Sequence, residues 1–258
     1  MQLELNDLRK TYLLPAPLLH RRGQGKPKTK QALAGVSITL GPGLYGLLGP
    51  NGAGKSTLIG IITGGLAADS GEVLWCGRPA HGIAFRRVLG YMPQQQGLYD
   101  SYTGRRFLAY MAALKEIPRA AVPGEVARVA AAVNLTDELD KRLAAYSGGM
   151  KQRAMIAMGI IAGADMILAD EPTKGLDEER IEMVVDAFHS LKDQAVLCVT
   201  HDLNFAREIS DSISVMYASN QVEYASAKEL LEHPLHPYTQ DMIAAMPENG
   251  LHFSEGFA

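Results

Sequence analysis

Residues 49–57 read Gly-Pro-Asn-Gly-Ala-Gly-Lys-Ser-Thr, the spacing of a loop that wraps the phosphates of a nucleotide. Glycines in such a loop let backbone N–H groups turn inward, where a side chain would block the phosphates. Lys55 could then reach the β- and γ-phosphates, and the Ser56 hydroxyl could hold Mg²⁺. The candidate nucleotide-binding residues are Gly49, Asn51, Gly52, Gly54, Lys55, Ser56 and Thr57.

Two acidic residues in succession, Asp170 and Glu171, follow a second apolar run. The run at 166–170 predicts a buried strand, and an acid at the carboxyl end of a parallel strand faces the ligand crevice. We expect Asp170 to hold Mg²⁺, directly or through water. Glu171 is then placed to polarise the water that attacks a phosphate.

Two more polar residues follow predicted strands. Gln94 comes after the strand predicted at 89–92, where its amide could coordinate Mg²⁺ or water and contact the helical segment beside it. His201 comes after the strand predicted at 195–200, and its imidazole could donate a hydrogen bond to a γ-phosphate. Both residues are therefore candidates for the catalytic site.

A second anion site is predicted where a helix opens near residue 148. Ser147 is expected to cap that helix, and Gly148 and Gly149 would expose backbone N–H groups to an anion. This site is separate in sequence from the phosphate loop. A plain helix cap is the alternative interpretation of the same three residues.

The elements that must position these residues alternate between strand and helix. Strands are predicted at 3–8, 34–40, 44–48, 72–76, 89–92, 166–170 and 195–200, helices at 56–62, 148–162 and 178–191, and a hairpin around 218–220. Apolar strands that alternate with helices indicate a mostly parallel sheet. Residues 103–146 instead carry apolar side chains at helical spacing, including Phe107, Leu114 and Val126, and predict a helical insertion.

Composition excludes several classes of protein. The chain has 258 residues, enough for a large core, with 47% hydrophobic and 21% charged residues. The net charge of −3 gives no indication of a nucleic-acid partner. Cys76 and Cys198 lack metal-site spacing and are expected to be buried, reduced thiols. The N-terminus does not resemble a signal peptide, and no apolar run approaches the roughly 20 residues of a membrane span.

Together these segments resemble the nucleotide-binding subunits of ABC transporters, over about residues 3–247. The resemblance implies an α/β P-loop ATPase with a mostly parallel core sheet, an antiparallel β subdomain and an inserted helical subdomain at about 97–162. Residues 1–258 would form one such ATPase domain that ends in a short His-Pro-Tyr extension at about 226–258. Its implied cofactors are ATP and Mg²⁺.

The resemblance also assigns roles to the motifs. Residues 49–57 would be the Walker A loop, Gln94 the Q-loop glutamine and Ser147-Gly148-Gly149 the core of the signature. The remaining counterparts are Asp170 as the Walker B aspartate, Glu171 as the catalytic base, Asp177 in the D-loop, His201 as the switch histidine and Tyr12 as the aromatic that stacks on adenine. The chain departs from the common pattern at Tyr146, Met150 and Lys174, where leucine, glutamine and a small residue are usual.

The family arrangement implies partners. Each ATP would lie between the Walker A loop of one subunit and the signature of a second ATPase subunit, in a homo- or heterodimer. The helical insertion would pass the motion to transmembrane permease subunits at the cytoplasmic face of the cell membrane. A solute-binding protein would be a further partner in an importer.

The cargo is less closely defined. Residues 229–240 and 148–158 resemble the ATPases of dipeptide, oligopeptide and nickel importers, whereas 49–57 and 91–99 resemble drug- or lipid-exporter ATPases. We favour import. ABC ATPases of translation or DNA repair are an alternative, but this chain has one motif set and no heptad run. The basic run at 20–30 is interpreted as a solvated hairpin insertion, with a phospholipid or nucleic-acid role as the alternative.

Overall fold

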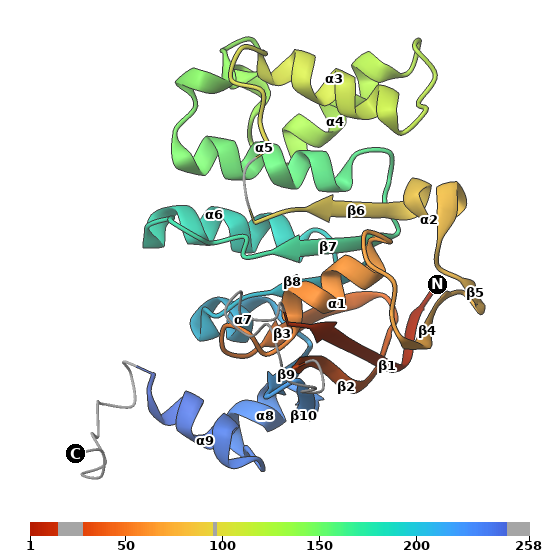
Figure 1. Ribbon diagram of the computed structural model, residues 1–258. Helices are drawn as coiled ribbons and strands as arrows, with labels where there is room; N and C mark the ends of the chain where they lie inside the picture. The colour runs from red at the N-terminus through yellow and green to blue at the C-terminus, as the bar shows by residue number, and fades with distance from the viewer. Residues whose placement is uncertain (15–27, 95–96, 247–258) are drawn as a thin grey trace, which may run out of the picture.

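The computed structural model describes residues 1–14, 28–94 and 97–246, apart from the side chain of Glu179. Most of the basic run at 20–30 lies outside the described residues, as does the end of the C-terminal extension. The elements form two sheets, a helical layer and a pair of C-terminal helices (Figure 1). This arrangement confirms the predicted class: α/β with a mostly parallel core sheet, an antiparallel β subdomain and an inserted helical subdomain.

The core sheet has six strands in the order β10-β9-β3-β8-β7-β6. Every neighbouring pair is parallel except β9 with β10. The bounds are β3 Gly43–Leu48, β6 Leu89–Met92, β7 Met166–Asp170, β8 Ala195–Val199, β9 Ser212–Tyr217 and β10 Asn220–Ser226. All five residues of β8 are buried, as expected for a central strand covered on both faces.

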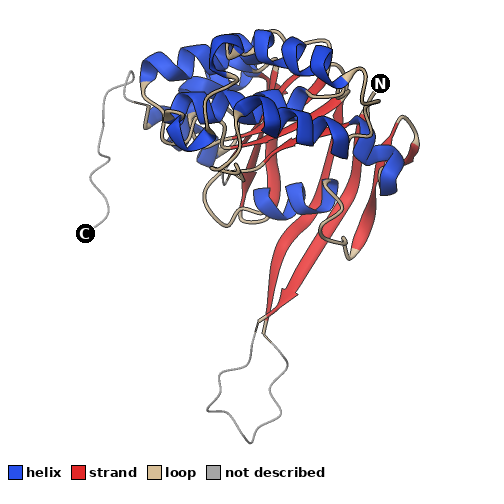
Figure 2. Ribbon diagram, turned by 90° about the horizontal axis from the view of Figure 1, so that it is seen from above, coloured by secondary structure: helices blue, strands red, loops and turns tan. Residues whose placement is uncertain are grey.

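The second sheet is antiparallel, in the order β2-β1-β4-β5. Its strands are β1 Leu3–Leu13, β2 Thr29–Leu40, β4 Ser70–Trp75 and β5 Arg78–Pro79. Strands β1 and β2 are longer than predicted. Their outer halves are exposed and therefore lack the alternation of apolar and polar residues on which the prediction depended; they pair mainly with each other, with register shifts along the ladder. Figure 2 shows this hairpin arm projecting from the body of the molecule.

Helices of the core flank its sheet. They are α1 Lys55–Ile62, α2 Gly82–Val88, α6 Glu178–His189 and α7 Leu203–Ile209. The sequence did not indicate α2 or α7, each of which has only seven residues. The apolar periodicity that identifies a helix in a sequence is recognised over a window longer than seven residues, so such short helices give no clear pattern.

The helical layer contains α3 Gly104–Leu114, α4 Val122–Ala132 and α5 Gly148–Ile160, with 3₁₀ turns η1 Thr136–Glu138 and η2 Leu143–Ala145 (Figure 1). Phe107 and Val126 are buried as predicted. Leu114 is instead 61% exposed, because it ends α3 beyond the packed part of the layer.

The C-terminal extension folds back onto the core sheet through α8 Ala227–Glu232 and α9 Pro237–Ala244. The Glu223 carboxylate of β10 accepts hydrogen bonds from the N–H groups of Leu235 (2.8 Å) and His236 (3.1 Å). The ring of Tyr238 stacks on Tyr217 with centroids 4.5 Å apart. The His-Pro-Tyr residues thus anchor the extension.

The expectation for the two thiols is half correct. Cys198 lies in β8 and is fully enclosed, and burial raises its pKa well above the ordinary value. Cys76 is exposed, which corrects the prediction of a buried thiol. It lies in the turn between β4 and β5 with φ of 51°, so the strand predicted to include it ends one residue earlier.

Candidate functional site

Four neighbouring strands bring the predicted residues to one edge of the core sheet. β6, β7, β8 and β3 are consecutive in the sheet and run parallel, so their carboxyl ends meet. Gln94 follows β6, Asp170 ends β7, His201 follows β8, and the phosphate loop follows β3. Residues far apart in the sequence therefore share one crevice, as the parallel topology requires.

A cavity of about 210 Å³ opens at this edge. It is lined by Tyr12, Lys30, Ala32, Pro50, Asn51, Gly52, Gly54, Lys55, Ser56, Thr57, Gln94, Asp170 and Glu171. The expected gathering of phosphate loop, glutamine and acids is thus observed. His201, Asp177 and the signature residues 147–149 are not among the lining residues.

The phosphate loop depends on its glycines. Gly49 and Gly54 have φ angles of 148° and 111°, a region that other residues rarely adopt. A Cβ on Gly49 would overlap the carbonyl oxygen of Met216, and one on Gly54 would overlap that of Ala32. Helix α1 starts directly after Gly54 without a side-chain cap, which leaves its first N–H groups available to an anion.

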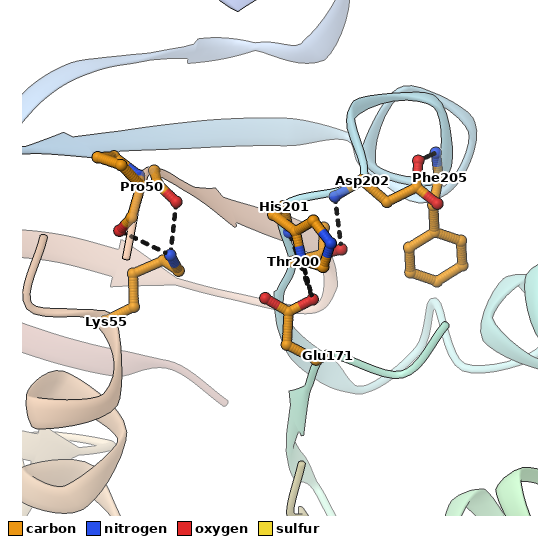
Figure 3. A network of polar contacts seen from close by, with 8 residues as sticks. Pro50, Lys55, Glu171, Thr200, His201, Asp202 and Phe205 are labelled. Carbon is orange, nitrogen blue, oxygen red and sulfur yellow. Dashed lines mark hydrogen bonds and ion pairs between the residues drawn. The ribbon is translucent and has the colours of Figure 1, made fainter. Parts of the chain in front are cut away.

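Lys55 is nearly enclosed, with 7% of its surface exposed. Its Nζ donates hydrogen bonds to the carbonyl oxygens of Gly49 (2.5 Å) and Pro50 (3.2 Å), as Figure 3 shows. Burial lowers the pKa of Lys55, while the charges of Glu171 and Asp170 act to raise it. The carbonyls orient the ammonium without neutralising it, which suits an anionic ligand such as phosphate.

Asp170 and Glu171 form the acidic side of the cavity. Burial, and next the neighbouring Glu171 carboxylate, raise the pKa of Asp170; Lys55 and Lys174 oppose this shift. A cation bound at the cavity would relieve that repulsion. Asp170, Gln94 and Ser56 supply oxygen atoms, and the described residues include no cluster of three or more His, Cys, Asp or Glu that could enclose a metal. Such a sparse set fits Mg²⁺, which retains waters and shares phosphate oxygens.

Glu171 is held in an unusual backbone conformation. Its φ is 54°, and its N–H donates to the carbonyl of Val199 in β8 (2.7 Å). One carboxylate oxygen, Oε2, lies 2.7 Å from Nδ1 of His201 (Figure 3). Strained residues held by their surroundings are frequent at functional sites. The backbone thus aims Glu171 at both the cavity and His201.

His201 is positioned by the start of α7. Asp202 caps this helix, accepting from the N–H of Phe205 at 3.0 Å, and its own N–H donates to Thr200 Oγ1 at 3.0 Å. The His201 side chain is 69% exposed and meets Glu171. It therefore joins the cavity through Glu171, and its outer part is free to meet a ligand.

The predicted signature site lies elsewhere on the surface. Ser147 caps α5, its Oγ accepting from the N–H of Met150 at 3.3 Å, as predicted. A Cβ on Gly149 would come 2.8 Å from Cδ of Arg180, a side chain that pairs with Asp177 at 2.9 Å. Tyr146, the departure from the usual leucine, is buried and donates to the Glu138 carbonyl at 2.8 Å.

Two residues of this region were not predicted from the sequence. Lys30 lines the cavity from strand β2. Gln152, buried in α5, donates to the carbonyl of Pro172, directly after Glu171. A lysine beside a basic run carries no distinguishing pattern in sequence, whereas a glutamine among the apolar positions of α5 could have indicated a buried polar contact.

Fold and site define a P-loop ATPase. The family model described as "ABC transporter" matches residues 33–174, more than half of the chain, so this protein belongs to the ABC transporter ATP-binding family. A second model, "Oligopeptide/dipeptide transporter, C-terminal region", matches residues 222–254. Among the described residues, no helix combines the length and hydrophobicity needed to cross a membrane.

Curated relatives include importers and other ABC proteins. The methionine import ATP-binding protein MetN of Thermobifida fusca is 31% identical over 90% of this chain and 75% of its own length. The sulfate/thiosulfate import ATP-binding protein CysA of Thermosynechococcus vestitus is 31% identical over 83% of this chain and 65% of its own. ABC transporter A family member 1 of Dictyostelium discoideum is 30% identical over 86% of this chain, which spans 26% of that protein.

A solved ATP-binding cassette, a dimer in a post-hydrolysis state bound to ADP and Pi, superposes with a TM-score of 0.73. The superposed region covers 87% of this chain and 98% of the cassette's chain, and the two sequences are 22% identical. At that identity the similarity establishes the fold.

Proposed function

We propose that this chain is the Mg²⁺-dependent, ATP-hydrolysing subunit of an ABC transporter. The observation that carries the proposal is one cavity at the carboxyl ends of four adjacent strands, lined by the phosphate loop, Gln94, Asp170 and Glu171. Its glycine-dependent cradle, buried Lys55 and strained Glu171 fit a triphosphate and the water that attacks it.

Each residue has a role in this proposal. Lys55 and the first N–H groups of α1 bind the β- and γ-phosphates. Ser56, Asp170 and Gln94 hold Mg²⁺, which supplies charge neutralisation at the phosphates when bound. Glu171 accepts a proton from the attacking water, and His201 fixes the Glu171 carboxylate and meets the γ-phosphate.

We infer that two subunits complete each ATP site. Ser147, Gly148 and Gly149 present a helix N-terminus that does not line the chain's own cavity, so its anion must come from a second subunit. The Asp177–Arg180 pair beside Gly149 would lie at the same interface. A homodimer and a heterodimer both satisfy this geometry.

A groove between the core and the helical layer is the proposed docking site for the permease. It has a volume of about 330 Å³ and a largely apolar lining that includes Leu89, Tyr91, Met111, Leu114 and Met158. Lys115 also lines this groove, and its Nζ donates hydrogen bonds to the carbonyls of Arg86 (2.6 Å) and Leu89 (2.5 Å). Burial lowers the pKa of Lys115.

Two exposed aromatic side chains lie near this groove: Tyr110 is on α3 one turn before Leu114, and Tyr99 packs against Tyr110. Tyr99 and Tyr110 are 47% and 39% exposed and pack edge-to-face at 5.8 Å. Large exposed apolar side chains beside a groove favour a protein partner. We propose that a segment of the transmembrane permease docks here, which places the subunit at the cytoplasmic face of the membrane.

For cargo we propose import of peptides or nickel-type solutes, delivered by a solute-binding protein. The matching oligopeptide/dipeptide C-terminal region and the importer relatives support this proposal. The similarity to ABC transporter A family members keeps an exporter as the second candidate.

The first test is phosphate release from MgATP by the purified chain. Wild type should hydrolyse ATP and require Mg²⁺, and Lys55→Met, which keeps the buried stem, should lose nucleotide binding. Absence of ATP binding by the folded wild type would refute the function.

The second test addresses partner and cargo. The subunit is co-purified in detergent with the membrane proteins encoded by its neighbouring genes, and compared with Leu114→Glu in the groove and Leu235→Glu, an exposed leucine of the extension. Only the groove variant should lose the complex. Vesicles containing the intact complex should then accumulate labelled dipeptide or Ni²⁺; extrusion of an apolar dye instead would favour the exporter.

A further inference from the structure

The cavity has a second lysine besides Lys55. Lys30 lies on β2, where it faces Tyr12 of β1 directly in the antiparallel register. Directly opposed residues of such a ladder project from the same face, and both side chains line the cavity. The hairpin arm therefore contributes an aromatic ring and an ammonium group to the lining of the cavity.

The Lys30 ammonium lies over the outer turn of the phosphate loop. A Cβ built on Gly52 would be 3.9 Å from Lys30 Nζ. Gly52 has φ of 83° and is itself a lining residue. On the same side, the Tyr12 hydroxyl lies 3.4 Å from Thr57 Oγ1 at the start of α1. The arm thus lies close to the phosphate loop at two places, at Thr57 through Tyr12 and at Gly52 through Lys30.

The Lys30 ammonium is available to an anionic ligand because its charge is not neutralised by an ion pair within the described residues. The cavity already contains the opposed charges of Lys55, Asp170 and Glu171. A nucleoside triphosphate adds several negative charges, of which Mg²⁺ offsets only two, so an unpaired ammonium at the mouth has a net anion to attract.

We propose that Lys30 is a further nucleotide-binding residue, which recognises the polyphosphate chain rather than the base. The proposal rests on the function proposed above. Lys30 is exposed and attracts ground state and transition state alike, so it contributes uniform binding. Loss of the Lys30 ammonium should raise KM by about two- to fivefold, as expected for an exposed charge, and leave kcat unchanged. The increase in KM should be smaller at high salt.

The experiment measures affinity for ATP, ADP and adenosine by calorimetry at low and high salt, with steady-state hydrolysis of MgATP. The variants are Lys30→Gln, Lys30→Glu and Lys30→Arg. The matched control is Lys28→Gln, an exposed lysine of the same arm that makes the same change in net charge but does not line the cavity. Thermal unfolding confirms that each variant folds.

Lys30→Gln should bind ATP and ADP about two- to fivefold more weakly, Lys30→Glu more weakly still, and Lys30→Arg as wild type. Adenosine affinity should not change. An equal loss in Lys28→Gln would show a general field effect and overturn the assignment, as would an equal loss for adenosine or an unchanged ATP affinity. If wild type itself binds no ATP, the proposed function fails; normal wild-type binding with an unaffected Lys30→Gln refutes the Lys30 assignment alone.

Discussion

Replacing Glu171 with glutamine tests the catalytic assignment most directly. The substitution keeps the size of the side chain and removes its capacity to accept a proton. Loss of a general base costs about 10²–10⁴-fold in rate, which corresponds to roughly 3–5 kcal/mol in the activation free energy. ATP affinity should remain within a few-fold, because the phosphate contacts proposed here come from the loop, Lys55 and α1.

The structure also sets the expected effect on stability. The Glu171–His201 contact of 2.7 Å is short, but the His201 side chain is 69% exposed, so solvent weakens it. An exposed pair contributes about 0–1 kcal/mol, and glutamine can still accept a hydrogen bond from His201. The apparent Tm should therefore change by only a few degrees, while the rate falls by orders of magnitude.

The assay compares phosphate release, ATP affinity and Tm for wild type and Glu171→Gln. His201→Gln serves as the companion variant, because it removes the imidazole and leaves the Glu171 carboxylate in place. It should lose less activity than Glu171→Gln if His201 acts chiefly by positioning. Near-normal turnover in Glu171→Gln, or loss of activity in proportion to lost ATP binding, would refute the reasoning.

Three further outcomes follow from the geometry. Asp170→Asn should raise the Tm of the nucleotide-free protein at neutral pH, because burial and Glu171 raise the Asp170 pKa and the ionised carboxylate therefore lowers stability, a loss that grows as pH rises through that pKa. Differential scanning fluorimetry with and without MgATP should show this higher Tm and also the loss of the ATP-induced shift in Tm. An unchanged or lower Tm for the nucleotide-free variant contradicts the prediction. Gly90→Ala should destabilise by about 1–3 kcal/mol in urea unfolding, because its Cβ would overlap the Gly159 carbonyl of α5, whereas Gly124→Ala, with open space around it, should not. Ser147→Arg should abolish ATP-dependent dimerisation of Glu171→Gln in light scattering, and a dimer that persists would disprove the two-subunit site.

Much of the core was predictable because its strands carry a local signal. β7 at Met166–Asp170 matches the prediction residue for residue, since a run of buried apolar residues ends in an acid. The prediction for β8 extended one residue further, to Thr200, which is buried and donates its N–H to the Leu47 carbonyl just beyond the end of the strand. The alternation of such runs with helices then determined the parallel topology.

The site was predictable to the extent that its residues follow strands. Each of Gln94, Asp170 and His201 could be placed at a strand end, and parallel pairing brings such ends together. Lys30 could not be placed, because it comes from the other sheet. Its approach to Gly52 depends on how two sheets pack, which no local pattern in the sequence encodes.

The buried amide of Gln152 connects the start of α5 to the segment that follows Glu171. Gln152 lies near the start of α5, whose first turn presents Gly148 and Gly149, and its side chain donates to the Pro172 carbonyl, directly after Glu171. Close-packed interiors transmit displacement rather than absorb it. If the proposed two-subunit site forms, a shift of α5 on meeting the second subunit's nucleotide would therefore be passed to the segment that holds Glu171. Glu171 has the strained φ of 54°, a conformation that persists only because the surrounding contacts hold it. In the proposed dimer, the Gln152–Pro172 contact would thus make the direction of the proposed base, Glu171, depend on the neighbouring subunit.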